Sequence, residues 1–210
     1  YTGSGPQALA DTTNKARAKE MLRDAGVPTP EWALFQGRGR TWEHVPGPWI
    51  MKPLNEDASI GIEDSSVVRD ARTLPPALQA MRRRFRQPIL IERFIEGREF
   101  NVSILGNRSG PRVLPPAEML FKDFPPGKER IVGFRAKWDP TAFEYHHTVR
   151  RFRFGRKDAG LIRRLRHLTR RCWEVFNLHG YVRVDFRVDA EGRAYVIEVN
   201  ANPCLAPDAG

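Results

Sequence analysis

Polar and charged side chains recur at every second position in residues 181–203, which read YVRVDFRVDAEGRAYVIEVNANP. The two strand-like runs around an acidic, glycine-containing turn predict a β-hairpin. Side chains alternate between the faces of a strand, so the residues able to do chemistry share one face. Those residues are Arg183, Asp185, Glu198 and Asn200, accompanied by Arg187 and Val196. The opposite face is apolar and is predicted to belong to the core: Val182, Val184, Phe186, Val188, Tyr195, Ile197 and Val199.

The register of this hairpin would bring two acids together. A four-residue loop over 190–193 places Asp185 opposite Glu198 and Arg183 opposite Asn200. Directly opposed carboxylates repel each other unless a cation lies between them. Arginine could supply the charge, which would make the face an exposed ladder of salt bridges. A divalent metal is the other interpretation, since Asp, Glu and an Asn carbonyl are hard oxygen ligands of the kind that Mg²⁺ takes. The hairpin alone leaves both interpretations open.

The elements that must position this hairpin follow from caps, breaks and periodicity. We predict one helix over residues 11–25, capped by Asp11 or Thr12 and ended by Gly26. A second helix should run from Pro75-Pro76 to about Arg86 and a third over about 157–178. Strands are predicted for EWALF, PWIMKP, PILIERF and REFNVSIL, a polar loop for 54–62, and irregular structure with short strands for 106–157. Strands and helices do not alternate regularly, so the pattern favours an α+β fold over a doubly wound parallel sheet.

Composition limits the class of protein. The 210 residues are 40% hydrophobic, enough for one domain or two small lobes. No apolar run reaches the roughly 18 residues of a membrane helix, and no signal pattern opens the chain. We therefore expect a soluble, cytoplasmic protein without membrane association. Cys172 and Cys204 are too few for a disulfide framework and form no CxxC pair. Because the sequence begins at Tyr1 rather than Met, we expect it to be part of a longer protein.

Arginine supplies most of the net charge of +10. It is concentrated around residues 82–86, 150–156 and 163–171. Such patches attract polyanions, so a basic nucleic-acid-binding module is the alternative function to weigh. Leu161, Leu165, Leu168, Cys172 and Val175 recur at helical spacing, which leaves the last cluster on the outer, solvated side of its helix. Aromatic residues are not interleaved as stacking platforms would be. Both points favour solvated faces over nucleic-acid binding.

Five segments in order resemble the ATP-grasp superfamily, most closely its D-alanine–D-alanine ligase branch. They are YTGSG with TTNKARAKEMLRDAGVPTP, IMKPLNEDASIGI, IERFIEGREFNV, RAKW, and GYVRVDFRVD with YVIEVNANP. The resemblance covers nearly the whole chain. It implies an ATP-grasp fold of two α+β lobes with the nucleotide held between them. Residues 1–95 would form the first lobe, with a linker helix and phosphate lid, and residues 96–210 the second lobe, with the metal-binding hairpin.

The resemblance also implies a nucleotide site. Lys15, Lys52 and Lys137 match lysines that face the phosphates, with Trp138 where an aromatic residue is usual. Residues 57–61 correspond to a lid, in which Ser59 and Gly61 would meet the phosphates.

In the hinge segment, the backbone of Arg93 and Ile95 would read the adenine edge and Phe94 would line its pocket. Glu92 begins this hinge. Glu99 matches the carboxylate that accepts hydrogen bonds from the ribose hydroxyls.

On the hairpin, Asp185, Glu198 and Asn200 match metal ligands, and Arg183 matches an arginine that steadies the transferred oxygens. The implied cofactors are ATP and two Mg²⁺ ions, with Mn²⁺ as the alternative metal. The implied reaction is a carboxylate–amine ligation through an acyl phosphate, with ADP and phosphate released. Its substrates would be small carboxylates and amines, most simply amino acids. The oligomeric state stays open.

One segment departs from the family pattern. After Asn202 the chain continues Pro203, Cys204, Leu205, where the D-alanine ligases usually have a Pro-Gly-Met stretch and a later serine. The use of D-alanine is therefore not implied, and we interpret Cys204 as a packing residue.

Overall fold

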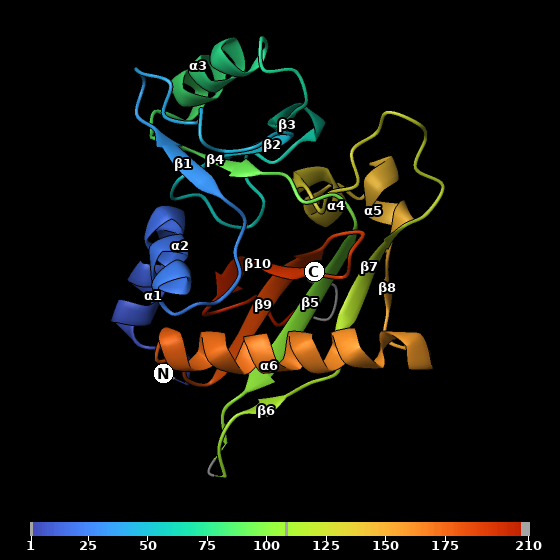
Figure 1. The fold of residues 1–210 in the computed structure, drawn as a ribbon. Helices are drawn as coiled ribbons and strands as arrows, with labels where there is room; N and C mark the ends of the chain where they lie inside the picture. The colour runs from blue at the N-terminus through green and yellow to red at the C-terminus, as the bar shows by residue number, and fades with distance from the viewer. Residues whose placement is uncertain (1, 108, 207–210) are drawn as a thin grey trace. The chain divides into compact units, whose positions relative to one another are not determined.

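The computed structural model describes residues 2–107 and 109–206. Figure 1 shows a mixture of helices with two sheets, as the predicted α+β class requires. Every strand pair with a described register is antiparallel. The elements are α1 (Pro6–Thr13), α2 (Lys15–Asp24), β1 (Trp32–Phe35), β2 (Trp49–Pro53), η1 (Asp64–Ser66), β3 (Val67–Val68), α3 (Leu74–Phe85), β4 (Ile89–Arg93), β5 (Arg98–Leu105), β6 (Arg112–Val113), β7 (Ala117–Phe121), α4 (Phe134–Trp138), α5 (Phe143–His147), β8 (Thr148–Arg151), η2 (Arg156–Asp158), α6 (Ala159–Val175), β9 (Tyr181–Val188) and β10 (Ala194–Asn200).

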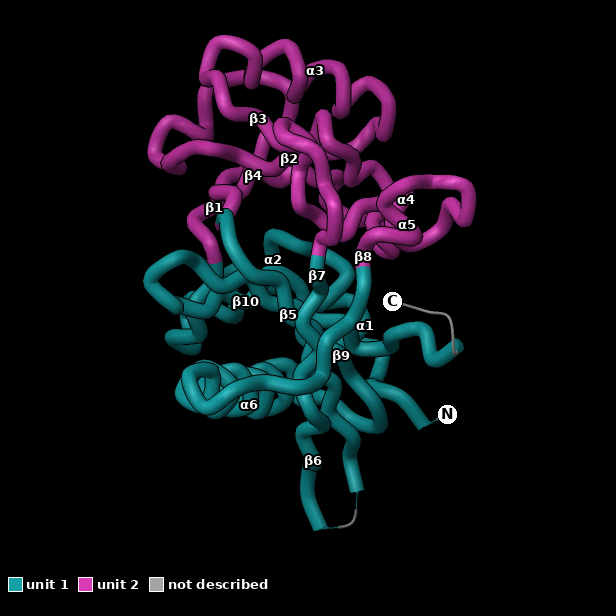
Figure 2. Tube along the Cα trace, turned by 90° about the vertical axis from the view of Figure 1, so that its right-hand side faces the viewer, with its two compact units in different colours: residues 1–29, 96–120, 149–210 teal, residues 30–95, 121–148 magenta. Residues whose placement is uncertain are grey.

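The chain forms two compact units, each built from separate segments (Figure 2). Unit 1 contains residues 1–29, 96–120 and 149–210, and unit 2 contains residues 30–95 and 121–148. The division into lobes of residues 1–95 and 96–210 stays a prediction, because these units describe contacts within the chain. Residues 1–29 join unit 1 because Leu22 and Val27 enter its core and the Val196 amide donates to the Pro28 carbonyl at 2.8 Å.

Unit 1 is a sheet covered on one face by α6, which Figure 1 shows lying across the strands. The strand order is β10-β9-β5-β7-β8, with β6 paired to β5. Leu165, Leu168 and Cys172 of α6 are buried against this sheet, at the spacing that the sequence predicted. The charged side of α6 faces away from the core, with exposed Arg163, Arg164, Arg166 and Arg170.

The predicted helix over residues 11–25 is wrong in one respect, because the structure has two helices there. Asn14 takes an extended backbone conformation between α1 and α2, and its side chain accepts a hydrogen bond from the Arg17 amide. Asn14 is therefore the N-cap in place of Asp11 or Thr12. The Thr12 hydroxyl instead donates to the carbonyl of Ala8 within α1. Gly26, at φ +67°, follows the end of α2 as expected.

Unit 2 contains a smaller sheet of order β1-β4-β2-β3. Its central strand β4 is fully buried at Ile89, Leu90 and Ile91, which explains the continuous apolar run in PILIERF. Helix α3 packs Leu74 and Leu78 against the sheet and ends at Arg86, whose left-handed conformation terminates the helix. The short helices α4 and α5 belong to the same unit.

A network of ion pairs holds the far edge of the unit 1 sheet. Glu118 of β7 is 4% exposed and accepts two hydrogen bonds from the Arg98 guanidinium of β5, at 2.8 and 2.9 Å. Arg151 of β8 also donates to Glu118, and Arg98 donates to Asp158 at the start of α6, at 2.8 Å. Burial acts to raise the pKa of Glu118, but the bonds from Arg98 and Arg151 outweigh it and lower that pKa.

We predict that Glu118→Gln destabilises the protein by about 2 kcal/mol at pH 7, because it leaves two arginines beside a neutral amide; the cost lies below that of a fully buried pair, since both arginines are partly exposed. The folded-state pKa of Glu118 is lowered, so its contribution is complete above the unfolded-state value of about 4.3 and is lost as the pH falls through the folded value. Denaturant unfolding at neutral and acidic pH measures this. A destabilisation that stays equal at both pH values would contradict the prediction, and Glu191→Gln in the exposed pair with Arg193 is the control.

Candidate active site

The β9–β10 hairpin has the register that the sequence predicted at its functional end. Asp185 pairs with Glu198, and Arg183 pairs with Asn200. The connection, however, is residues 189–193 rather than a four-residue loop, and a register shift between Val196 and Glu198 restores the pairing. This is a β-bulge, in which the strand accommodates one extra residue.

The bulge corrects the predicted faces of β10. Val196 pairs with Phe186 and is completely buried in the core, whereas the sequence pattern placed it on the polar face. Tyr195, predicted for the core, pairs with Arg187, and its hydroxyl lies 3.4 Å from a carboxylate oxygen of Asp189. Ile197 occupies the bulge and is only half-buried. The physical reason is the one-residue shift of register at the bulge. It moves the side chains of β10 on the loop side of the bulge to the opposite face of the sheet.

Asp185 is the centre of the polar face and is 5% exposed. Arg183 approaches it with two nitrogens, Nε at 2.7 Å and Nη2 at 2.9 Å. The amide of Asn101 donates to Asp185 Oδ1 at 2.7 Å, and the amide of Asn200 donates to Oδ2 at 3.1 Å. Asn200 Nδ2 also lies 3.3 Å from Glu198 Oε2, so this side chain stands between the two opposed acids. The structure thus brings together all four residues that the hairpin pattern singled out.

The two acids are not neutralised equally. Burial disfavours the charge on Arg183, yet the negative charges of Asp185, Glu198 and Glu99 outweigh it and raise the Arg183 pKa. Asp185 therefore has an arginine partner, as the salt-bridge interpretation requires. Glu198, in contrast, makes no ion pair within residues 2–107 and 109–206. A carboxylate held beside a second carboxylate without its own cation is a position where a bound cation would be stabilising.

The donor set fits a hard divalent ion. Asp185 and Glu198 offer carboxylate oxygens to a metal. Rotating the Asn200 side-chain amide by half a turn would present Oδ1 to the same metal in place of Nδ2. In the described part of the chain, no group of three or more His, Cys, Asp or Glu side chains could hold a metal, so a site here needs the Asn200 oxygen.

Strand β5 adds residues to the same face. Glu99 pairs with Arg187 in the strand register, and its carboxylate lies 3.6 Å from the Arg187 guanidinium. Asn101 pairs with Asp185 and was not singled out from the sequence. The signal that could have found it is the alternation in REFNVSIL, which places Asn101 on the same face as Glu99. Lys15 is the first residue of α2 in the same unit.

In unit 2, Lys52 and Glu92 form a buried ion pair. Lys52 Nζ of β2 lies 3.0 Å from Glu92 Oε2 of the neighbouring strand β4, and Glu92 is 1% exposed. At the end of β4 the Arg93 amide donates to the Glu31 carbonyl and the Phe94 amide to the Pro48 carbonyl. The ring of Phe94 packs with Ile50 and Ile131. Ile95 follows and is buried.

The loop over residues 57–61 is fastened to α4 within the same unit. Ala58 and Ser59 both have positive φ, which is uncommon for residues other than glycine. The Ser59 hydroxyl donates to the Val132 carbonyl at 2.9 Å, and the Trp138 indole donates to the Ala58 carbonyl at 2.8 Å. Gly61 is also positive in φ, and a side chain there would collide with Phe85. Lys137, next to Trp138, is half-exposed.

No helix among the described residues is both long and apolar enough to cross a membrane.

Comparison with known proteins places this chain in a family. The D-alanine–D-alanine ligase of Chromohalobacter salexigens is 35% identical over 97% of this chain and 59% of the relative. The corresponding enzyme of Synechococcus sp. (strain JA-2-3B'a(2-13)) is 31% identical over 99% of this chain and 59% of the relative. The chain thus spans about three-fifths of the length of these relatives.

Solved structures share the fold. The D-alanine–D-alanine ligase from Bacillus anthracis, crystallised in complex with ATP, matches 97% of this chain and 59% of its own with a TM-score of 0.71 at 22% identity. That match confirms the predicted ATP-grasp fold. The family described as "D-ala D-ala ligase C-terminus" matches residues 21–207, and this chain is a member of it.

Proposed function

We propose that the protein containing this chain is an ATP-dependent, ADP-forming carboxylate–amine ligase. One observation carries the proposal. Asp185 and Glu198 are directly opposed on a sheet face, and Glu198 makes no ion pair in the described part of the chain. Membership of the D-alanine–D-alanine ligase family supports ATP and a divalent metal as the groups that meet this face. The reaction joins a carboxylate to an amine, and its dependence on ATP favours the cytoplasm.

We assign the nucleotide phosphates to Lys15, Lys52 and Lys137, with Ser59 and Gly61 in the lid. A lysine is a mobile point charge and suits this role. Glu99 would accept hydrogen bonds from the ribose hydroxyls. Trp138 would hold the lid through its bond to Ala58.

For the adenine, the Arg93 amide is already bonded to Glu31, so Arg93 would use its carbonyl. Ile95 would supply the amide. Glu92 fixes the strand from which this segment leaves, and Phe94 would lie against the base.

Asp185, Glu198 and Asn200 are the residues that would hold the metal, as two Mg²⁺ ions or with Mn²⁺ in their place. A bound divalent ion would neutralise charge between the carboxylates and the phosphates. Arg183, oriented by its two bonds to Asp185, would stabilise the oxygens that gain charge during transfer. The substrate carboxylate attacks the terminal phosphate, and the amine then displaces phosphate from the acyl phosphate. The protein contributes positioning and electrostatics to both steps.

The substrates proposed are amino acids. Phosphate release by the full-length protein, measured with ATP, Mg²⁺ and a panel of D- and L-amino acids, tests the proposal. Amino-acid-dependent phosphate release supports it, and its absence across the panel overturns it.

A nucleic-acid-binding role is the alternative. Arg163, Arg164 and Arg170 of α6 are exposed and make no ion pair within the described residues. Phosphate-dominated binding weakens steeply with salt. Tight DNA or RNA binding with that salt dependence, and no ATP binding, would favour this alternative.

We predict that Glu198→Gln in the full-length protein keeps the fold and most of the nucleotide affinity but lowers turnover by about 100-fold or more. The amide preserves the shape while removing the charge that a bridging metal needs. Tm, ATP binding and phosphate release measure the three effects. Glu191→Gln, in the loop of the same hairpin, is the matched control. Near-normal ligation by Glu198→Gln would favour the salt-bridge ladder over the metal site.

We predict that Lys52→Met weakens ATP binding by about tenfold or more, the value of one charged hydrogen bond. The variant also leaves Glu92 buried without this lysine, so it should lose stability. Adding Glu92→Gln removes the buried charge and should restore stability but not ATP affinity. Calorimetric titration and thermal unfolding separate the two effects. Recovery of ATP affinity together with stability would rule out a direct phosphate contact.

A further inference from the structure

Helix α4 carries Lys137, yet it is a single short element over Phe134–Trp138. An isolated helix of this length is not stable, so tertiary contacts must hold it. On one side it is fastened by the Trp138 bond to Ala58 and by the Phe134 amide, which donates to the Ile62 carbonyl at 3.0 Å. Gly133 allows this close approach, because a side chain there would lie 2.6 Å from the same carbonyl.

The other side of α4 borders a cavity of about 480 Å³ in unit 2. Arg135 and Ala136 line it, together with Ile62, Pro125, Ile131 and Phe143, whereas Lys137 and Trp138 do not. A cavity provides no dense packing to support the helix. The support on this side must therefore come from the polar groups that cross it.

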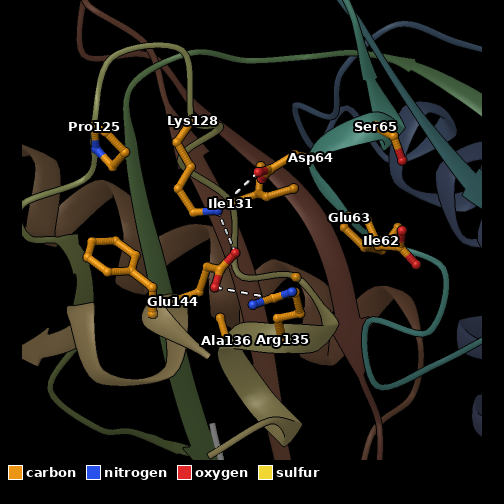
Figure 3. A pocket seen from close by; sticks show the side chains of 12 residues that line it. Ile62, Glu63, Asp64, Ser65, Pro125, Lys128, Ile131, Arg135, Ala136 and Glu144 are labelled. Carbon is orange, nitrogen blue, oxygen red and sulfur yellow. Dashed lines mark hydrogen bonds and ion pairs between the residues drawn. The ribbon is translucent and has the colours of Figure 1, made fainter. Parts of the chain in front are cut away.

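Four charged side chains make that crossing (Figure 3). Glu144 of α5 lies at the centre and is 8% exposed. Lys128 Nζ lies 2.5 Å from Glu144 Oε1, and Arg135 Nε of α4 lies 3.4 Å from Glu144 Oε2. Lys128 also binds Asp64 of η1 at 3.1 Å, so the chain of ion pairs joins η1, α5 and α4.

The charges in this network are balanced, with two of each sign. Burial acts to raise the pKa of Glu144, but the bond from Lys128 outweighs it and lowers that pKa, while Glu144 and Asp64 raise the Lys128 pKa. Both shifts favour the charged forms of Glu144 and Lys128. Glu144 is the one member that contacts both cations.

We propose that Glu144 is a positioning residue that fixes α4 and, through α4, the side chain of Lys137. This inference rests on the phosphate-facing role proposed for Lys137. Loss of the Glu144 charge releases Arg135 and leaves the cavity side of α4 without an anchor. The helix then samples other positions, and Lys137 meets the transferred phosphate less often.

The structural test uses the indole N–H signal of Trp138 in a nitrogen–proton spectrum, assigned by its loss in Trp138→Phe. We expect Glu144→Gln to shift this signal and to speed its hydrogen exchange about tenfold. Arg135→Gln cuts only the link to α4 and should do the same. The other indole signals, from Trp32, Trp42, Trp49 and Trp173, should keep their positions and so show that the protein is folded. The control is Glu129→Gln, next to Lys128 in sequence but paired with Arg69 at 2.9 Å. An unchanged Trp138 signal in both variants would overturn the inference.

The kinetic test uses the full-length protein with ATP and amino acids. We expect Glu144→Gln to lower kcat by about 10- to 100-fold, as a misplaced catalytic group does, with little change in ATP affinity. In a Lys137→Met background the same substitution should have no further effect, because the two act as one unit. Additive losses would show that Glu144 does not act through Lys137, and would overturn the inference. Wild-type protein without phosphate release would overturn the proposed function alone, and the Trp138 signal would still decide whether Glu144 fixes α4.

Discussion

The opposition of Asp185 and Glu198 across the β9–β10 hairpin is the constraint on which unit 1 depends. Two directly opposed carboxylates cost stability unless their charge is compensated. Arg183, Asn101 and Asn200 all turn their donors toward Asp185, and α6 fills the opposite face with apolar side chains. The apolar core thus holds β9 and β10 together against the repulsion between the two carboxylates on their polar face. A face on which Asp185 has an ion-pair partner and Glu198 makes no ion pair among the described residues is suited to bind a cation.

Unit 2 handles charge in a different way. Glu92 and Glu144 are buried and form ion pairs with Lys52 and Lys128. These carboxylates therefore hold lysine side chains of the protein and do not bind a metal ion. The result is a set of lysine side chains whose positions are determined by acids on neighbouring elements. Lys52 is held by a strand neighbour, while Lys137 depends on a helix that ion pairs and the Ala58 bond must support. The first arrangement is rigid, and the second is the more easily disturbed.

The sequence was most informative where structure follows from neighbouring residues. The strands around Trp32, Trp49, Ile89 and Arg98 and the buried stripe of α6 agree with periodicity, because short-range sterics and burial determine them. The Asn14 cap was missed because Asp11 and Thr12 are N-cap residue types as well, and the sequence does not distinguish them from Asn14. The assignment of residues 121–148 to unit 2 depends on contacts far apart in the chain, and so does the Glu144 network. No local pattern encodes these contacts.

The hairpin shows why a correct site can follow from an incorrect local prediction. A four-residue loop without a bulge and a longer connection with a bulge bring the same residues together at Asp185 and Glu198. The predicted and the observed registers differ only between the loop and the bulge. In the observed register Val196 lies in the core and Tyr195 lies on the polar face. The bulge adds one residue on β10 and so offsets the longer loop. The apolar residue at 196 and the hydroxyl at 195 are then the sequence features that favour this solution, because the buried position takes valine and the tyrosine hydroxyl reaches Asp189. Register at the functional end is therefore fixed by the charged residues and their strand partners, while the loop end is fixed by burial.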